Sequence, residues 1–182
     1  MSLTFFVVLI IIILLADVGI VLINKYNEIA KTYIKINDAE INIDETLREK
    51  YDLITKVINI IEKNTDVESK VLDEIKNIKS DKYSNFEIDR LLTKCFKEII
   101  KIASDYDSVS KNKSFKSMKE KLKDTEEKLI ALRTFYNKYT TKYNLLLSTF
   151  PSNIVAKVGK YELKSQYDGK NLTDENIKDF KI

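Results

Sequence analysis

The chain opens on an apolar run that is long enough to cross a lipid bilayer. Residues 3–23 read LTFFVVLIIIILLADVGIVLI. At 1.5 Å per residue, a helix of this length spans about 30 Å, the thickness of the hydrocarbon core of a membrane. We interpret residues 1–23 as an uncleaved transmembrane anchor. A cleavable signal peptide is the alternative, but no basic residue precedes the run, and Leu14-Leu15-Ala16 is not a small-x-small cleavage site.

Basic residues follow this run but do not precede it. Lys25, Lys31 and Lys35 come within one loop length of its end, whereas residues 1–23 contain no lysine or arginine. By the positive-inside rule, this bias predicts a single-pass protein of the cell membrane, with the N-terminus outside and the helical domain in the cytoplasm.

Asp17 is the one charged side chain within the run. It lies about two helical turns from the inner end, where inserting a carboxylate costs about 1–3 kcal/mol. We favour a position close enough to the interface for Asp17 to reach water or to stay protonated. The alternative is a pair with a polar group on a partner helix.

Behind the anchor, apolar residues recur with alternating spacings of four and three, the pattern of amphipathic helices that face a core. Nothing between residues 23 and 29 breaks a helix, so we expect the anchor to continue into a helix that ends near Asn64. Polar clusters at 79–85 and 104–114 separate three further helices, which carry residues 67–78, 88–106 and 115–150. In the last of them, apolar residues recur every seven positions, and Pro151 then stops the helix.

These patterns predict an all-α protein. Residues 24–151 are expected to form an antiparallel up-and-down bundle of three to four long helices, and residues 152–182, which lack a sustained period, a polar tail that is extended or partly disordered. Glu40 and Lys50 fall on the apolar seam of the first bundle helix. We interpret them as the edge of the stripe, with a buried polar pair or a partner groove as alternatives. A second apolar row widens that stripe: Ile34, Ile41, Tyr51 and Ile58.

Composition narrows the chemistry more than the fold. The 182 residues include 3 Gly, 1 Pro, 1 Cys and no His, which leaves too few turn residues for a sheet and no imidazole for a metal site or a nucleophile–base pair. The 31 basic and 28 acidic residues are interleaved, so the net charge of +3 is not that of a nucleic-acid binder. Cys95 lies on an apolar stripe and is interpreted as a core residue. We therefore predict no catalytic, cofactor-binding or metal-binding residues.

Two segments resemble a known family. Residues 43–54, IDETLREKYDLI, are close to the pattern I-D-x-x-L-x-x-R-Y-D-L-I, and residues 133–156 resemble R-x-x-Y-N…Y-N…F-P-x-N-x-x-A. Together with the N-terminal anchor, these segments resemble the LemA family in order and spacing over roughly residues 1 to 160. The motif positions are Asp44, Leu47, Tyr51, Asp52, Arg133, Tyr136, Asn137, Tyr143, Asn144, Phe150, Pro151 and Asn153.

The sequence departs from the family pattern at three places. Glu49 stands where the family usually has a second basic residue, Thr55 stands in place of a proline, and residues 37–40 read NDAE in place of an Ala-Trp pair. The resemblance implies a membrane-anchored helical bundle and offers no catalytic residue to carry over.

The combined expectation is a non-enzymatic scaffold or adaptor at the bacterial cytoplasmic membrane, with the lipid bilayer and an unidentified protein as partners. The alternative is a self-associating structural protein that organises or shapes membrane or, as the resemblance implies, an envelope-stress accessory factor. Nothing in the sequence indicates a nucleic acid, a small-molecule substrate or a cofactor.

Overall fold

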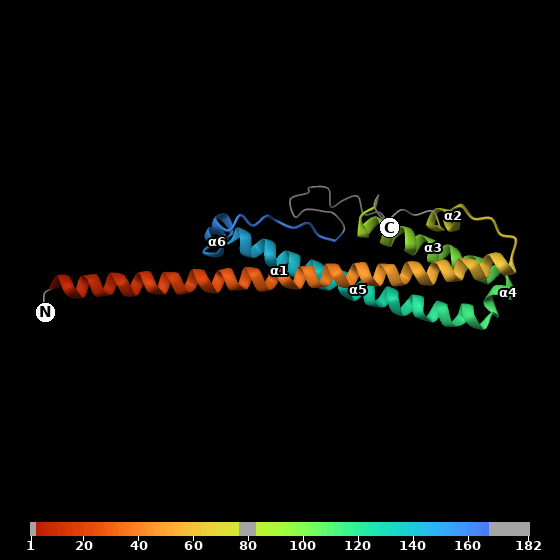
Figure 1. The fold of residues 1–182 in the computed structure, drawn as a ribbon, viewed down its shortest axis with the longest axis horizontal. Helices are drawn as coiled ribbons and strands as arrows, with labels where there is room; N and C mark the ends of the chain where they lie inside the picture. Colours follow the sequence, from red (N-terminus) through yellow and green to blue (C-terminus); the bar gives the residue numbers. More distant parts are fainter. Residues whose placement is uncertain (1–2, 77–82, 168–182) are drawn as a thin grey trace. The chain divides into compact units, whose positions relative to one another are not determined.

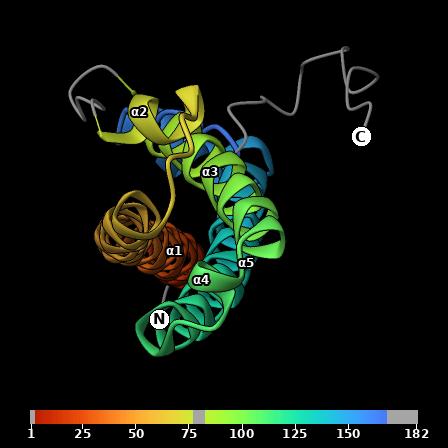
Figure 2. The same ribbon diagram turned by 90° about the vertical axis from the view of Figure 1, so that its right-hand side faces the viewer.

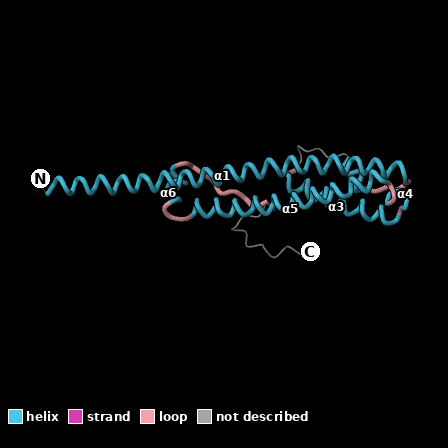
Figure 3. The backbone as a smooth tube through the Cα atoms, turned by 90° about the horizontal axis from the view of Figure 1, so that it is seen from below, coloured by secondary structure: helices cyan, strands magenta, loops and turns pink. Residues whose placement is uncertain are grey.

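The computed structural model describes residues 3–76 and 83–167 (Figure 1). This part of the chain is helical and contains no strand (Figure 3), so the all-α class is confirmed. The helices are α1 (Leu3–Asn64), α2 (Lys70–Lys76), α3 (Asn85–Asp105), α4 (Asp107–Ser110), α5 (Lys113–Ser148) and α6 (Ser152–Val158).

Local capping explains where the helices begin. Before α3, the Ser84 hydroxyl accepts a hydrogen bond from the backbone N–H of Glu87 at 3.3 Å, and the Glu87 carboxylate accepts one from the backbone N–H of Ser84 at 2.8 Å. This reciprocal capping box satisfies two donors that the first turn leaves unpaired. Before α5, the side-chain oxygen of Asn112 accepts from the backbone N–H groups of Ser114 and Phe115.

The chain folds as two compact units, and both contain part of α1 and part of α5. Residues 39–135 form one of them, here called the distal unit. In it, Lys50 of α1 contacts α3 and α5, while Ser108 of α4 bonds the end of α1 at Asn64. Figure 2 shows α1, α3 and α5 as neighbouring helices. The buried apolar residues of the distal unit are Ala39, Ile43, Leu47, Leu53, Ile54, Val57, Ile58, Ile61, Leu72, Ile75, Leu92, Cys95, Ile99, Ile102, Ala103, Val109, Phe115, Leu122 and Leu129.

Residues 1–38 and 136–182 belong to the second, here called the proximal unit. Here α1 runs antiparallel to α5, because Lys35 bonds Tyr139 and, further back along α1, Glu28 pairs with Lys142. The core of this unit is a cluster of Ile29, Ile36, Tyr143, Leu146 and Ala156.

The beginning of the predicted C-terminal tail is ordered, so that expectation is wrong for residues 152–158. They form α6, whose Ser152 and Ala156 are buried. The helix ends at Gly159, where an added Cβ would lie 2.6 Å from the Tyr161 ring, and Lys160 then adopts a left-handed conformation with φ of 52°. Residues 168–182 of the predicted tail lie outside the described part.

Three details of the predicted apolar pattern are wrong. Ile34 and Ile41 are more than half exposed, because each lies two residues, or about 200° around the helix, from a core isoleucine. Phe150 is 79% exposed, since α5 ends at Ser148, before the last position of the seven-residue repeat. The polar stretch 104–114 is not merely a connection: it contains α4, whose Val109 is fully buried.

The opposite exposure of two isoleucines on α1 gives a matched test of the distal core. Ile54 is fully buried and Ile41 is 58% exposed. We expect Ile54→Ala to lower the free energy of unfolding by about 2–5 kcal/mol, because it leaves a cavity. Ile41→Ala should change it by about 0.5 kcal/mol or less. Urea unfolding of the full-length protein in detergent, followed by circular dichroism, measures both. Equal effects of the two substitutions would contradict the assigned core.

Candidate functional site

The four motif positions of residues 43–54 meet at one pocket of the distal unit. Asp44, Leu47, Tyr51 and Asp52 line it from α1, with Asn85 and Ile88 of α3 opposite. Asp44 is held by Arg48, whose Nε lies 2.9 Å from its carboxylate. The pocket has a volume of about 380 Å³ and is open to solvent. Asp44 and Arg48 are four residues apart on α1, and such a pair is typical of a helix surface.

Four charged side chains of the distal unit form a network, here called the ion network, in which the first two are buried and the last two are partly exposed: Lys50, Asp89, Glu126 and Arg133. Lys50 is fully buried, and its Nζ contacts a Glu126 oxygen at 2.5 Å, the Thr93 hydroxyl at 2.9 Å and an Asp89 oxygen at 3.5 Å. Lys50 therefore does not lie at the edge of the stripe, which corrects the interpretation that the sequence favoured. Glu40, by contrast, is exposed and does lie at the edge.

Arg133, a motif position, closes the ion network from α5. Its Nε lies 2.9 Å from one oxygen of Asp89, and its Nη2 lies 3.1 Å from the other oxygen and 3.1 Å from Glu126. Each carboxylate thus contacts both cations. Two positive and two negative charges balance, which offsets much of the cost of removing them from water.

The two carboxylates titrate differently because they are buried to different depths. Burial raises the pKa of Asp89 above its ordinary value, and the nearby charges of Arg133 and Lys50 only partly oppose this. Burial also acts to raise the pKa of Glu126, but hydrogen bonds and charges from Lys50 and Arg133 outweigh it, so the net shift is downward. Glu126 is therefore the ionised anchor of the network, which ties α1, α3 and α5 together.

The Tyr-Asn repeat of the second motif lies in the proximal unit and binds the chain after α6. Asn144 donates to the backbone oxygen of Lys164 at 2.8 Å and accepts from its backbone N–H at 3.0 Å. Asn137 accepts from the backbone N–H of Tyr167 at 2.8 Å, and Tyr136 donates to the backbone oxygen of Ser165. We call residues 164–167 with these three side chains the clasp.

The spacing of the repeat matches the chain that it binds. Seven residues of helix rise about 10.5 Å, and three residues of extended chain span about 10 Å. Asn137 and Asn144 are therefore separated by nearly the same distance as Lys164 and Tyr167. A side-chain amide carries one donor group and one acceptor, so it pairs with a backbone in the way that a neighbouring strand would.

The clasp is also joined to α1. The Lys164 ammonium lies 3.3 Å from the side-chain oxygen of Asn37 and 5.0 Å from the centre of the Tyr33 ring. Tyr33 in turn packs against Tyr143, a motif residue that is almost completely buried. These contacts give the Tyr-Asn repeat a structural role: it holds the C-terminal segment over the α1–α5 pair.

The remaining motif positions and Asp17 are not brought to these sites. Pro151 precedes the first turn of α6, Asn153 lies within that turn, and Phe150 projects into solvent. Asp17 is exposed on α1. The sequence identified these positions as a motif, but it gave no sign of what they contact.

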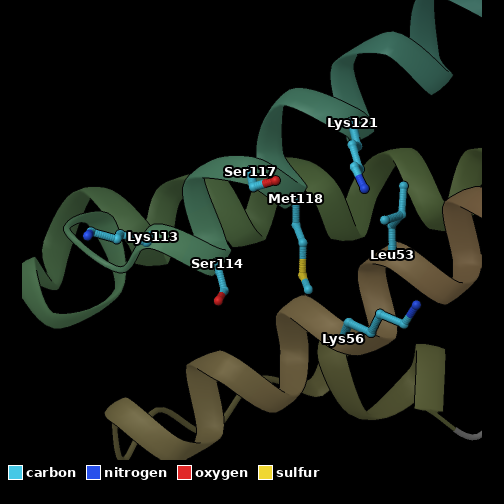
Figure 4. Close-up of a pocket in the computed structure, with 7 residues that line it drawn as sticks. All are labelled: Leu53, Lys56, Lys113, Ser114, Ser117, Met118 and Lys121. Carbon is cyan, nitrogen blue, oxygen red and sulfur yellow. The ribbon is translucent and has the colours of Figure 1, made fainter.

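A second pocket of the distal unit, of about 350 Å³, lies between α1 and the start of α5 (Figure 4). Lys56, Lys113 and Lys121 give it a positive lining, and no carboxylate contributes. The first amides of α5 are already bonded to Asn112, so they are not available to a bound anion. The rest of its lining is Leu53, Ser114, Ser117 and Met118.

Two kinds of group that could support catalysis are the cysteine thiol and clusters of metal-ligating side chains. Burial raises the pKa of the Cys95 thiol to about 12, so the thiolate that would act as a nucleophile does not form at neutral pH. Within residues 3–76 and 83–167, no group of three or more Asp, Glu, Cys or His side chains could hold a metal ion.

Taken together, the fold and these sites define an all-helical protein with an apolar N-terminal helix. A Tyr-Asn repeat on its last long helix binds the chain that follows α6. A model of the LemA family matches residues 39–179, which is well over half of the chain and includes both motifs. The chain therefore belongs to the LemA family. No curated protein matches it.

Glu126 provides a pH-dependent test of the ion network. Because its folded pKa is depressed below the ordinary 4.5, its stabilising contribution is present above pH 4.5 and is lost as the pH falls through the folded pKa. We expect Glu126→Gln to lower the free energy of unfolding at pH 7 by about 1–3 kcal/mol. The difference from the parent protein should shrink below pH 4.5. Urea unfolding at both pH values measures it.

Its neighbour Glu127 is exposed and serves as the matched control. Glu127→Gln should have an effect of about 0.5 kcal/mol or less at either pH. A Glu126→Gln effect that stays the same at low pH would show that its charge does not stabilise the fold.

The clasp predicts a local loss of protection when its amide is removed. In Asn144→Ala, the backbone N–H of Lys164 loses its acceptor, so hydrogen exchange in residues 161–167 should quicken by about tenfold or more. Exchange within α3 should be unchanged. Mass-spectrometric exchange of the full-length protein measures both, with Asn27→Ala on the exposed face of α1 as the control. Unchanged exchange at 161–167 would refute the clasp.

Proposed function

We propose that this protein is a non-enzymatic scaffold or adaptor of the bacterial cytoplasmic membrane. Residues 3–23 span the bilayer, and the helices behind them present a binding surface in the cytoplasm. The observation that carries the proposal is the continuity of α1: a single helix contains the apolar run and also supplies core residues to both units.

The apolar run supports the anchor because nothing in the described chain covers it. It has a mean hydropathy of 3.3 over its most apolar window, and none of that window is buried. Sixteen large apolar side chains of residues 3–23 are exposed. At about 25 cal/mol per Å² of apolar surface, their contact with water is strongly unfavourable. Hydrocarbon removes this cost, and a helix satisfies its own backbone there.

The charges just beyond the run support a cytoplasmic domain. Lys25 and Lys142 both pair with Glu28, at 3.0 and 3.1 Å, so this end of the proximal unit keeps a positive balance from two helices. Lys31 adds a further exposed charge. Basic residues beside the membrane are retained on the cytoplasmic side.

Two observations support a role in binding instead of catalysis. The buried charges of the ion network neutralise one another, and the one thiol is held protonated. Ile34, in contrast, is an exposed apolar side chain on α1 beyond the anchor. The proposal places the docking of another helix at this position. Ile34 would serve equally as a contact with a second copy, which is the form that the self-associating alternative takes.

One experiment in intact cells tests the anchor and the partner together. A photo-crosslinking amino acid replaces Ile34, with exposed Lys123 on α5 as the control position. We expect the protein to stay in the membrane fraction after carbonate extraction, and irradiation to join position 34 to a different protein. Release by carbonate would refute the anchor. An adduct only with a second copy would favour the self-associating alternative, and no adduct specific to position 34 would refute both.

A further inference from the structure

The phenylalanine of the Phe-Pro-x-Asn motif, Phe150, lies in solvent. Packing among the described residues therefore does not account for a large apolar side chain at this position. Phe150 is 79% exposed in the turn before α6, and Ile154 and Val158 are 46% and 81% exposed on the helix itself. Ile154 and Val158 are four residues apart, so they share one helix face, while Ser152 and Ala156 are buried on the other. We call Phe150, Ile154 and Val158 the α6 apolar face.

Contacts within the proximal unit place α6 beside the start of the bundle. Ala156 of α6 belongs to the same core cluster as Ile29 of α1. Burial raises the pKa of Tyr161, as does a hydrogen bond with Tyr26, which lies three residues beyond the apolar run. In Figure 1, α6 lies next to α1 at the end of α5 that faces the N-terminal segment.

The pairing of α1 with α5 sets the height of Phe150. Lys142 is level with Glu28, and Tyr139 is level with Lys35. Because the helices are antiparallel and rise equally per residue, Ser148 comes level with residues 22–26 of α1. The turn that holds Phe150 is therefore level with the end of the apolar run at Ile23. If that run spans the hydrocarbon, Phe150 stands at its boundary, within the interfacial layer.

The polar surroundings of the face are those of an interfacial helix. Lys157 and Lys160 are exposed next to Ile154 and Val158. A helix that lies in a membrane surface inserts its apolar side chains and keeps lysines level with the lipid headgroups, where anionic lipids attract them.

We propose that the α6 apolar face is a second membrane contact, inserted into the interface of the leaflet from which the anchor emerges. Its ligand is the lipid surface, and anionic lipid is favoured by Lys157 and Lys160. This contact rests on the proposed membrane anchor. Under this proposal, each part of the motif region has its own role. Pro151 forms the turn into α6, the buried side of α6 docks on α1, and Phe150 enters the bilayer.

Depth-dependent fluorescence quenching tests the contact in the full-length protein. The protein is reconstituted in vesicles of phosphatidylcholine and phosphatidylglycerol, some of which carry a nitroxide near the headgroup end of the acyl chain. An environment-sensitive dye is attached to Ile154→Cys or Val158→Cys. Cys95 can remain, because its buried thiol resists labelling. Ile20→Cys reports the anchor, and Ile130→Cys on α5, which is similarly exposed, reports background.

We expect strong quenching at positions 20, 154 and 158, at least about twofold above position 130. Phe150→Asp should reduce the quenching at 154 and leave that at 20 unchanged. Quenching at 20 with background values at 154 and 158 would overturn this contact while the anchor stands. Protection of the dye at 154 from aqueous iodide, with no quenching by the lipid nitroxide, would also overturn this contact, since a protein would then cover the face. No quenching at 20 would refute the anchor and this contact with it.

Discussion

A helix of 62 residues without an interruption is the constraint on which the rest of the structure depends. Between residue 3 and Asn64, α1 contains no proline, and its one glycine is Gly19 within the apolar run. Apart from the first four N–H groups and the last four C=O groups, its backbone is therefore satisfied internally. In the distal unit, α3, α4 and α5 contact α1. In the proximal unit, α5 and α6 contact it.

The two motifs stabilise this arrangement by different means. In the distal unit, the ion network joins three helices through charges that are satisfied only when all of them are present, since each carboxylate contacts both Lys50 and Arg133. Such a network contributes little net stability compared with an apolar core, but removing one of its members leaves a poorly compensated charge. In the proximal unit, the side-chain amides of Asn137 and Asn144 bond the backbone of residues 164 and 167 as a neighbouring strand would. The spacing of these two amides along α5 therefore sets the position of that segment.

The sequence was sufficient for the long helices and insufficient for the contacts between them. The apolar period predicts α1, α3 and α5, because each is long enough for an apolar stripe to repeat several times. Helix α6 was missed because its seven residues show no period and its buried positions, Ser152 and Ala156, are small. The sequence does not predict the burial of Lys50, because its carboxylate partners lie 39 and 76 residues away. Without those partners, a lysine on an apolar stripe cannot be distinguished from one at the edge of the stripe.

The same reasoning explains why a motif can be recognised well before its role is. Tyr136, Asn137 and Asn144 stand out by their spacing, yet their targets are backbone atoms of residues 164–167, whose side chains carry no matching signal. Phe150 belongs to the same motif, and its side chain is 79% exposed among the residues that the structure describes. Exposing a side chain of this size to water carries a hydrophobic cost. Under the proposed second membrane contact, the lipid interface at the end of the apolar run removes that cost.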